Sequence, residues 1–131
     1  MRIVVIGGSG HVGSFLVPRL VRARHEVVNL TRGTSAPYVD DEAWADVEQI
    51  QVDRAAEDAA GTFGQRVAGL EADVVVDMIC FTPDSAAALV QALRGHSEHL
   101  VHCGTIWRYG VSLKQPMRED DTSPPFGEYG T

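Results

Sequence analysis

Short apolar runs alternate along the chain with longer segments of helical periodicity. Five of these runs are only a few residues long and rich in Val, Ile and Leu, which is typical of strands inside a parallel sheet. Asp73–Ile79 is almost continuously β-branched, so we expect it to be the most buried. The expected strands are the run that ends before Gly7, then Glu26–Thr31, Val47–Val52, Asp73–Ile79 and His99–Cys103.

The segments between these runs carry apolar residues at the spacing of a helix. Pro18 falls inside the first segment and is expected to kink it, because proline has no backbone N–H to donate. Thr82 and Pro83 open the last segment as N-cap and first helical residue, and Gly95 ends it. The expected helices are Val12–Ala23, the later part of Ala55–Gly69, a helix through Ala86 to Leu93, and one turn around Asp41–Asp46 anchored by Trp44.

Strands that alternate with helices in this way predict right-handed βαβ units and a single sheet. We therefore expect an α/β fold of the Rossmann type, a doubly wound parallel sheet of five strands in the order 3-2-1-4-5. The tail from Gly104 to Thr131 is rich in Pro, Gly and acidic residues. We expect this tail to be a loop or partly disordered.

A glycine-rich turn follows the first apolar run. Gly8, Gly10 and Gly13 fit the spacing G-x-G-x-x-G, while Gly7, Gly10 and Gly13 fit the related spacing G-x-x-G-x-x-G. In either spacing one glycine permits a sharp turn, one lets backbone approach a pyrophosphate, and one lets the helix pack on the strand. The pyrophosphate then lies at the positive end of the helix. The turn predicts a dinucleotide-binding domain over residues 1–131.

Thr31 and Arg32 end the second expected strand, where the adenosine ribose of a bound dinucleotide lies. An acidic residue there would bond the 2′-hydroxyl of NAD. A neutral hydroxyl beside a guanidinium suits the 2′-phosphate of NADP instead, because arginine binds phosphate through two parallel hydrogen bonds. We therefore prefer NADP over NAD. The alternative, a surface arginine that caps a turn, stays open.

Length and charge narrow the class of protein. A chain of 131 residues can bury one core, but it is short for a complete dinucleotide-dependent enzyme, which usually adds a substrate-binding part. No apolar run approaches the roughly 20 residues needed to span a bilayer. Two cysteines suit a reducing cytoplasm. The net charge of −7 argues against non-specific binding to nucleic acid or to an anionic membrane.

Other clusters of polar residues in the chain are interpreted as structural features and not as binding sites. Four residues near the fifth expected strand resemble a ligand set, namely His96, His99, His102 and Cys103. Because His99 and His102 would point to opposite faces of a strand, we predict no metal site. Cys80 and Cys103 are expected to be reduced packing residues at adjacent strand ends. The acidic residues Asp40–Glu42 are expected to be solvated.

Several motifs together resemble one known family. The chain is similar to the extended short-chain dehydrogenase/reductases, the NAD(P)-dependent epimerase/dehydratase family, and most similar to the branch that includes the chloroplast stem-loop-binding proteins. The resemblance covers the whole chain but only the front half of a family member. The motifs that carry it are the glycine turn, Asp53-Arg54 after the third strand, the segment Cys103–Gly110 and the tail Arg118–Gly130.

The resemblance implies a role for each cofactor-binding position. Arg32 matches the ribose-phosphate position, and Asp53 matches the acid that bonds the adenine edge, with Arg54 beside it. The residues that match the phosphate-binding turn are Gly7, Ser9, Gly10, His11, Val12 and Gly13. Those at the end of the fourth strand, which borders the cofactor, are Met78, Ile79 and Cys80, although the small residues usual there are absent.

The resemblance also implies two catalytic positions. Thr105 matches the hydroxyl that bonds the substrate, and Tyr129 matches the catalytic tyrosine of Tyr-x-x-x-Lys. The matching lysine would be residue 133, beyond the last residue, Thr131. Without that lysine the tyrosine keeps a pKa near about 10 and cannot transfer a proton efficiently. We therefore expect a truncated chain that binds NADP weakly or not at all, does not turn over, and exposes apolar surface.

Two functions of different classes follow from the resemblance. The first is an NADP- or NAD-dependent enzyme that reduces, epimerises or dehydrates a small polar substrate such as a nucleotide sugar. The second is a non-catalytic NADP-binding regulator or RNA-associated protein. An inactive truncated product is a third interpretation. A lysine at position 133 would favour the enzyme. A homodimer through the helix after the fourth strand is a further expectation from the family.

Overall fold

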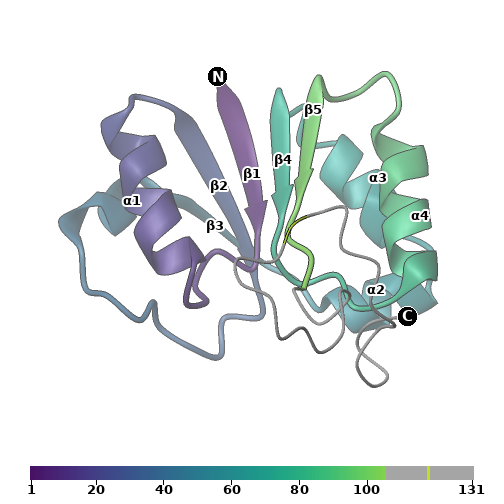
Figure 1. Cartoon of the computed structure of the whole chain (residues 1–131), viewed down its shortest axis with the longest axis horizontal. Helices are drawn as coiled ribbons and strands as arrows, with labels where there is room; N and C mark the ends of the chain where they lie inside the picture. The colour runs from purple at the N-terminus through teal and green to yellow at the C-terminus, as the bar shows by residue number, and fades with distance from the viewer. Residues whose placement is uncertain (106–117, 119–131) are drawn as a thin grey trace.

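The computed structural model describes residues 1–105 and residue 118 (Figure 1). Five parallel strands form one sheet in the order β3-β2-β1-β4-β5, which confirms the expected Rossmann-type fold. The strands are β1 (Arg2–Ile6), β2 (Glu26–Thr31), β3 (Glu48–Gln51), β4 (Val74–Asp77) and β5 (His99–His102). The helices are α1 (Gly13–Arg22), the 3-10 helix η1 (Glu42–Asp46), α2 (Arg54–Ala59), α3 (Phe63–Ala68) and α4 (Pro83–Leu93).

The register of the sheet brings the carboxyl ends of its strands to one edge. Ile6, the last residue of β1, pairs with Leu30 of β2 and with Asp77 of β4. Asp77 in turn pairs with His102, the last residue of β5. The arrowheads of β1, β4 and β5 accordingly end side by side in Figure 1. Loops that leave these strands therefore meet at the same edge.

Each face of the sheet is covered by its own helices, with α1 on one side and α3 and α4 on the other (Figure 1). The side chains of β1 alternate between the two cores, as the period of a strand requires. Val4 and Ile6 belong to the cluster that includes Phe63 of α3 and Leu89 of α4. Ile3 and Val5 belong to the cluster of α1, with Trp44 of η1 packed against it. The anchoring role expected for Trp44 is confirmed.

The segment between β3 and β4 differs from the prediction, which places a helix only in the later part of this segment. It holds two short helices, because Asp53 caps α2 by accepting a hydrogen bond from the Ala56 N–H and α2 begins at once. Gly61 then interrupts the helix with a left-handed φ of 68°. Gly64 is not simply a weak helix residue. A Cβ there would lie 2.7 Å from the Ala92 Cβ, so glycine lets α3 approach α4 closely.

The ends of α4 agree with the expectation. Thr82 caps the helix by accepting a hydrogen bond from the Ser85 N–H at 3.3 Å, and Pro83 occupies the first turn. Gly95 follows the helix with a φ of 77°. In α1 the helix continues through Pro18, which is buried. The kink predicted at Pro18 stays a prediction.

The acidic segment before β3 is not simply solvated. Asp41 accepts a hydrogen bond from the Ala43 N–H as the cap of η1, and its two carboxylate oxygens accept from Arg22 at 2.8 and 2.9 Å. This pair joins η1 to α1. The expectation that Asp41 is solvated is therefore wrong, because its charged partner Arg22 lies 19 residues away and is brought to it only by the fold.

Both cysteines are free thiols, with Cys80 half-buried and Cys103 exposed. Within the described part of the chain, no helix has the length and apolar character needed to cross a membrane. The loop expected from Gly104 onward falls almost entirely on residues 106–117 and 119–131, outside the described residues.

Candidate functional site

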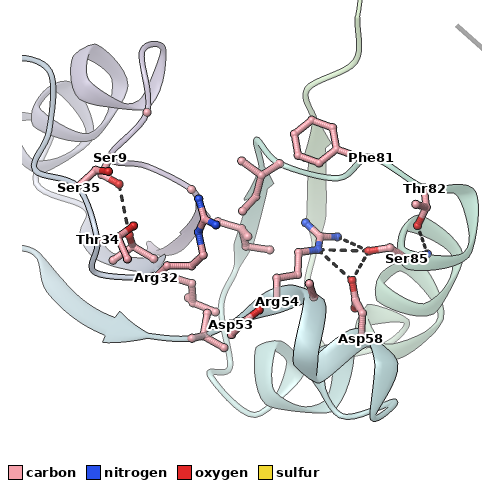
Figure 2. Close-up of a pocket in the computed structure, with 18 of the residues that line it drawn as sticks. Ser9, Arg32, Thr34, Ser35, Asp53, Arg54, Asp58, Phe81, Thr82 and Ser85 are labelled. Carbon is pink, nitrogen blue, oxygen red and sulfur yellow. Dashed lines mark hydrogen bonds and ion pairs between the residues drawn. The ribbon is translucent and has the colours of Figure 1, made fainter. Parts of the chain in front are cut away.

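A cleft of about 670 Å³ opens at the carboxyl edge of the sheet, beyond the ends of β1 and β2. The chain passes from β1 to β2 on one side and later returns to β4 on the other, so the cleft lies where the strand order reverses. Open parallel sheets bind ligands at such a reversal point. The lining residues come from the glycine turn, the loop after β2, the start of α2 and the loop between β4 and α4 (Figure 2).

The glycines of the turn differ in their steric surroundings. Gly7 has a φ of 82°, and a Cβ there would lie 2.7 Å from Ile79 Cγ2. A Cβ at Gly13 would lie 2.2 Å from the Gly8 carbonyl oxygen, so the start of α1 packs directly on the turn. Gly10 differs, since the nearest atom to its Cβ is the Gly7 oxygen at 3.4 Å, and it lines the cleft. Packing within the turn therefore does not require glycine at residue 10.

A buried amide holds the glycine turn to the sheet. Asn29 of β2 is fully buried, and its Oδ1 accepts a hydrogen bond of 2.8 Å from the Gly8 N–H. Its Nδ2 donates to Gln49 Oε1 at 2.8 Å. A Cβ at Gly8 would lie 2.6 Å from that Asn29 oxygen, so Gly8 is required as well. Sequence reasoning did not select Asn29, although a lone amide inside an apolar strand is a signal for such a role.

A second buried side chain connects the turn to the loop after β2. The Ser14 hydroxyl donates to the Gly10 carbonyl at 2.8 Å and accepts from the Tyr38 N–H at 2.8 Å. The rings of His11 and Tyr38 are 4.1 Å apart, centroid to centroid. The loop that carries Tyr38 is thereby held against the start of α1 and forms part of the cleft wall.

The end of β2 presents hydroxyl groups and a cation to the cleft. Ser9 Oγ and Thr31 Oγ1 are 3.3 Å apart, which joins the turn to the strand end. Arg32, Thr34 and Ser35 follow and all line the cleft. The Arg32 guanidinium forms no hydrogen bond or ion pair with residues 1–105 or 118. Figure 2 shows it projecting from the wall opposite Arg54.

Arg54 also lines the cleft, and the cofactor contact expected of it stays a prediction. Its guanidinium is buried and donates to Asp77 Oδ1 at 2.6 Å. It also donates to Ser85 Oγ at 2.9 and 3.2 Å and to Asp58 Oδ2 at 3.3 Å (Figure 2). It also lies over the Phe63 ring at 4.8 Å. Burial opposes its charge, but the hydrogen bond and charge of Asp77 outweigh burial and raise the pKa of Arg54.

The cleft brings together eight of the thirteen residues expected to bind the cofactor. Asp53 lines it while also capping α2. Met78 packs into the core on the α1 side instead. The expected residues that line the cleft are Gly7, Ser9, Gly10, Thr31, Arg32, Asp53, Arg54 and Ile79. Those that do not are His11, Val12, Gly13, Met78 and Cys80. Lining residues that sequence reasoning missed include Thr34, Ser35, Tyr38, Asp58, Phe81 and Ser85.

The two expected catalytic residues have different outcomes. Thr105 follows β5 and is exposed. Tyr129 lies outside the described residues. The catalytic roles of both residues stay predictions.

Comparison with protein families agrees with this geometry. Residues 3–131 match the NAD dependent epimerase/dehydratase family. This chain belongs to that family. The resemblance expected from the glycine turn, from Asp53-Arg54 and from the later motifs is therefore confirmed at the level of the family.

Two relatives with assigned activities are similar over nearly the whole chain. The 2′-dehydrokanamycin reductase of Streptomyces kanamyceticus is 32% identical over 99% of this chain and 35% of its own length. The dTDP-6-deoxy-L-talose 4-dehydrogenase (NAD(P)(+)) of Kitasatospora kifunensis is 28% identical over 98% of this chain and 43% of its own. This epimerase/dehydratase chain thus spans well under half the length of either relative.

Solved structures of the epimerase/dehydratase family share the fold. The UDP-glucose 4-epimerase of Thermotoga maritima, solved with UDP-glucose, superposes with a TM-score of 0.75 at 17% identity. The match covers 99% of this chain and 47% of that enzyme. At this identity the comparison supports the fold and not the substrate.

Proposed function

We propose that the cleft of this chain binds NADP in preference to NAD, and that the protein uses it for hydride transfer at a carbon of a sugar substrate. The observation that carries the proposal is Arg32, whose guanidinium faces the cleft and has no acidic partner among residues 1–105 and 118. A cation in that position is suited to an anionic group of a ligand.

The fit of a dinucleotide rests on the shape and polarity of the cleft. Gly10 leaves space beside the turn, and α1 directs its positive end toward that space. Asp53 also lines the cleft, and its carboxylate could accept a hydrogen bond from an adenine amino group. Arg32, Thr34 and Ser35 line the cleft as well and offer a cation and two hydroxyls.

Preference for NADP follows from the charge at the end of β2. The two dinucleotides differ by a 2′-phosphate on the adenosine ribose. Arg32 and its neighbouring hydroxyls can donate to that phosphate, and no carboxylate follows β2 directly to repel it. Hydrogen bonds to charged groups contribute about 1.5–3 kcal/mol, which corresponds to about tenfold to a hundredfold in affinity.

The bound dinucleotide would supply hydride acceptance and donation at its nicotinamide. For the protein we propose that Thr105 donates a hydrogen bond to a substrate oxygen and that Tyr129 exchanges the proton of that oxygen, with a lysine after Tyr129 lowering its pKa. A sugar substrate is favoured because the names of the two similar relatives specify dTDP-6-deoxy-L-talose and 2′-dehydrokanamycin. In each case the chemistry concerns a carbon that bears oxygen.

Titration of the chain with NADP and with NAD tests the proposal. We expect tighter binding of NADP by about tenfold or more, measured by calorimetry or by amide chemical shifts. Arg32→Ala should remove this preference and leave the affinity for NAD unchanged. Arg94→Ala is the matched control, because Arg94 is exposed at the end of α4, away from the cleft, and its removal changes the net charge equally.

Two results would contradict the proposal. If the wild-type chain bound NADP and NAD with equal affinity, Arg32 would not select NADP through its 2′-phosphate. An Arg32→Ala variant that loses affinity for both dinucleotides equally would assign Arg32 to the shared part of the cofactor instead.

A further inference from the structure

Three metal-binding side chains meet beside the cleft, at the ends of β4 and β5. Asp77 and His102 are the last residues of these strands and pair in register. Cys80 follows Asp77 by three residues in the loop toward α4. One donor atom from each of the three, a carboxylate oxygen, a thiol sulfur and an imidazole nitrogen, lies within 4.8 Å of the other two. None of the three lines the cleft.

The Asp77 carboxylate has an unused oxygen directed into this cluster. Its side chain is 1% exposed, and its Oδ1 accepts from Arg54 at 2.6 Å and from the Ile79 N–H at 3.3 Å. Its Oδ2 is buried without a hydrogen-bond partner. His102 Nδ1 lies 3.9 Å from this oxygen, too far for a hydrogen bond. A buried oxygen of this kind calls for a ligand.

We infer that Asp77, Cys80 and His102 bind a divalent transition metal, with Zn²⁺ as the best match. Zinc accepts mixed oxygen, sulfur and nitrogen donors in a tetrahedral arrangement. Three protein donors leave the fourth position to water. This inference does not rest on the proposed NADP binding, because none of the three residues lines the cleft.

The geometry requires only a modest closure around the ion. Bonds of the usual length, about 2.0–2.3 Å, place the donors of a tetrahedral zinc about 3.3–3.6 Å apart. His102 is 44% exposed and Cys80 lies on a loop, so both side chains can rotate toward the fixed Asp77 oxygen. Arg54 orients the Asp77 carboxylate from its other oxygen, as the outer partners of metal ligands do.

The positions of these three residues explain why the sequence alone does not predict the cluster. The sequence predicts no metal site at the histidine-rich segment, because a strand directs His99 and His102 to opposite faces. The cluster in the structure takes only His102 from that strand. Its other two members come from β4 and the loop that follows, and parallel pairing brings them together.

Titration with Co²⁺ tests the site, because cobalt replaces zinc and reports its donors by absorption. The wild-type chain should bind one Co²⁺ with a thiolate-to-cobalt charge-transfer band and the intense visible bands of tetrahedral cobalt. Cys80→Ser should remove the charge-transfer band. His102→Ala should weaken Co²⁺ binding by about tenfold or more, since loss of an outer partner alone costs that much. Circular dichroism checks that each variant folds.

Matched controls lie next to the site. Cys103→Ser removes the other thiol and His99→Ala removes a histidine of the same strand, and neither belongs to the cluster. Both should bind Co²⁺ as the wild type does. The inference is overturned if the wild type shows no saturable charge-transfer band, if Cys80→Ser keeps the band, or if Cys103→Ser loses it.

Discussion

The guanidinium of Arg54 and the carboxylate of Asp77 form a buried ion pair of 2.6 Å that joins the start of α2 to the end of β4. Asp58 and Ser85 complete the hydrogen bonds of Arg54, and the Ser85 hydroxyl donates to Asp58. The wall of the cleft on this side is thus a network of charges from three elements, with Ser85 belonging to α4. Its integrity depends on every member, because a buried polar group without its partner is costly.

Arg54→Met is expected to destabilise the fold strongly. The variant leaves Asp77 as a buried charge without a cation, and breaking such a pair costs about 3–5 kcal/mol. Urea unfolding followed by circular dichroism measures the loss. Arg66→Met is the control, because Arg66 in the 2.7 Å Arg66–Glu57 pair is 49% exposed, against 9% for Arg54, and its loss should cost much less. If Arg54→Met and Arg66→Met lost the same stability, burial would not explain the contribution of the Arg54–Asp77 pair.

Gly10→Ala and Gly13→Ala are expected to separate ligand binding from stability. A Cβ at Gly13 would lie 2.2 Å from the Gly8 oxygen, so the fold should lose about 1–3 kcal/mol or more. A Cβ at Gly10 meets the nearest atom only at 3.4 Å, so the fold should remain stable. Dinucleotide affinity should nevertheless fall in Gly10→Ala, because the added methyl group fills the space beside the turn.

Melting temperature and NADP titration, measured on both variants, decide that prediction. A Gly10→Ala variant with unchanged NADP affinity would show that the pyrophosphate does not approach the turn at this residue.

Asn29→Leu is expected to cost about 1–3 kcal/mol of stability, because the buried Gly8 N–H loses its acceptor. The affinity for a dinucleotide should also fall, and by more than the loss of stability accounts for, because Asn29 holds the glycine turn in position. Gln49→Met removes only the outer partner of Asn29 and should have a smaller effect on both quantities. The comparison uses urea unfolding and NADP titration. A larger effect of Gln49→Met would contradict the prediction, because the Asn29–Gln49 hydrogen bond would then matter more than the Gly8–Asn29 bond.

Stability is expected to depend on pH through Asp41. The Ala43 N–H and then the Arg22 guanidinium lower the pKa of this carboxyl from its ordinary value. A lowered pKa stabilises the fold above the unfolded value of about 3.9, and the stabilisation is lost as pH falls through the folded value. Asp41→Asn should therefore unfold more easily than the wild type at neutral pH, and the difference should shrink below about pH 4.

Arg22→Met distinguishes the two causes at Asp41. The Ala43 hydrogen bond is the larger one and remains in this variant, so most of the acid dependence should persist. Urea unfolding at a series of pH values measures both variants. An Arg22→Met variant without acid dependence would assign the lowered pKa to the ion pair instead.

The fold and the glycine turn could be predicted from the chain because they depend on local pattern. A strand such as Glu26–Thr31 is defined by residues that are adjacent in sequence, and its observed bounds match the prediction. The alternation of strands and helices then restricts the sheet to few topologies. Arg32 could be selected because its role depends only on its place after β2.

The partners of the buried polar groups required three-dimensional contact. Asn29 lies 21 residues from Gly8, and Asp77 lies 23 residues from Arg54. The local pattern of residues does not specify which strand end will lie beside which helix start. Packing brings these side chains together, and burial makes their pairing obligatory, because each charge or amide must find a partner once water is excluded.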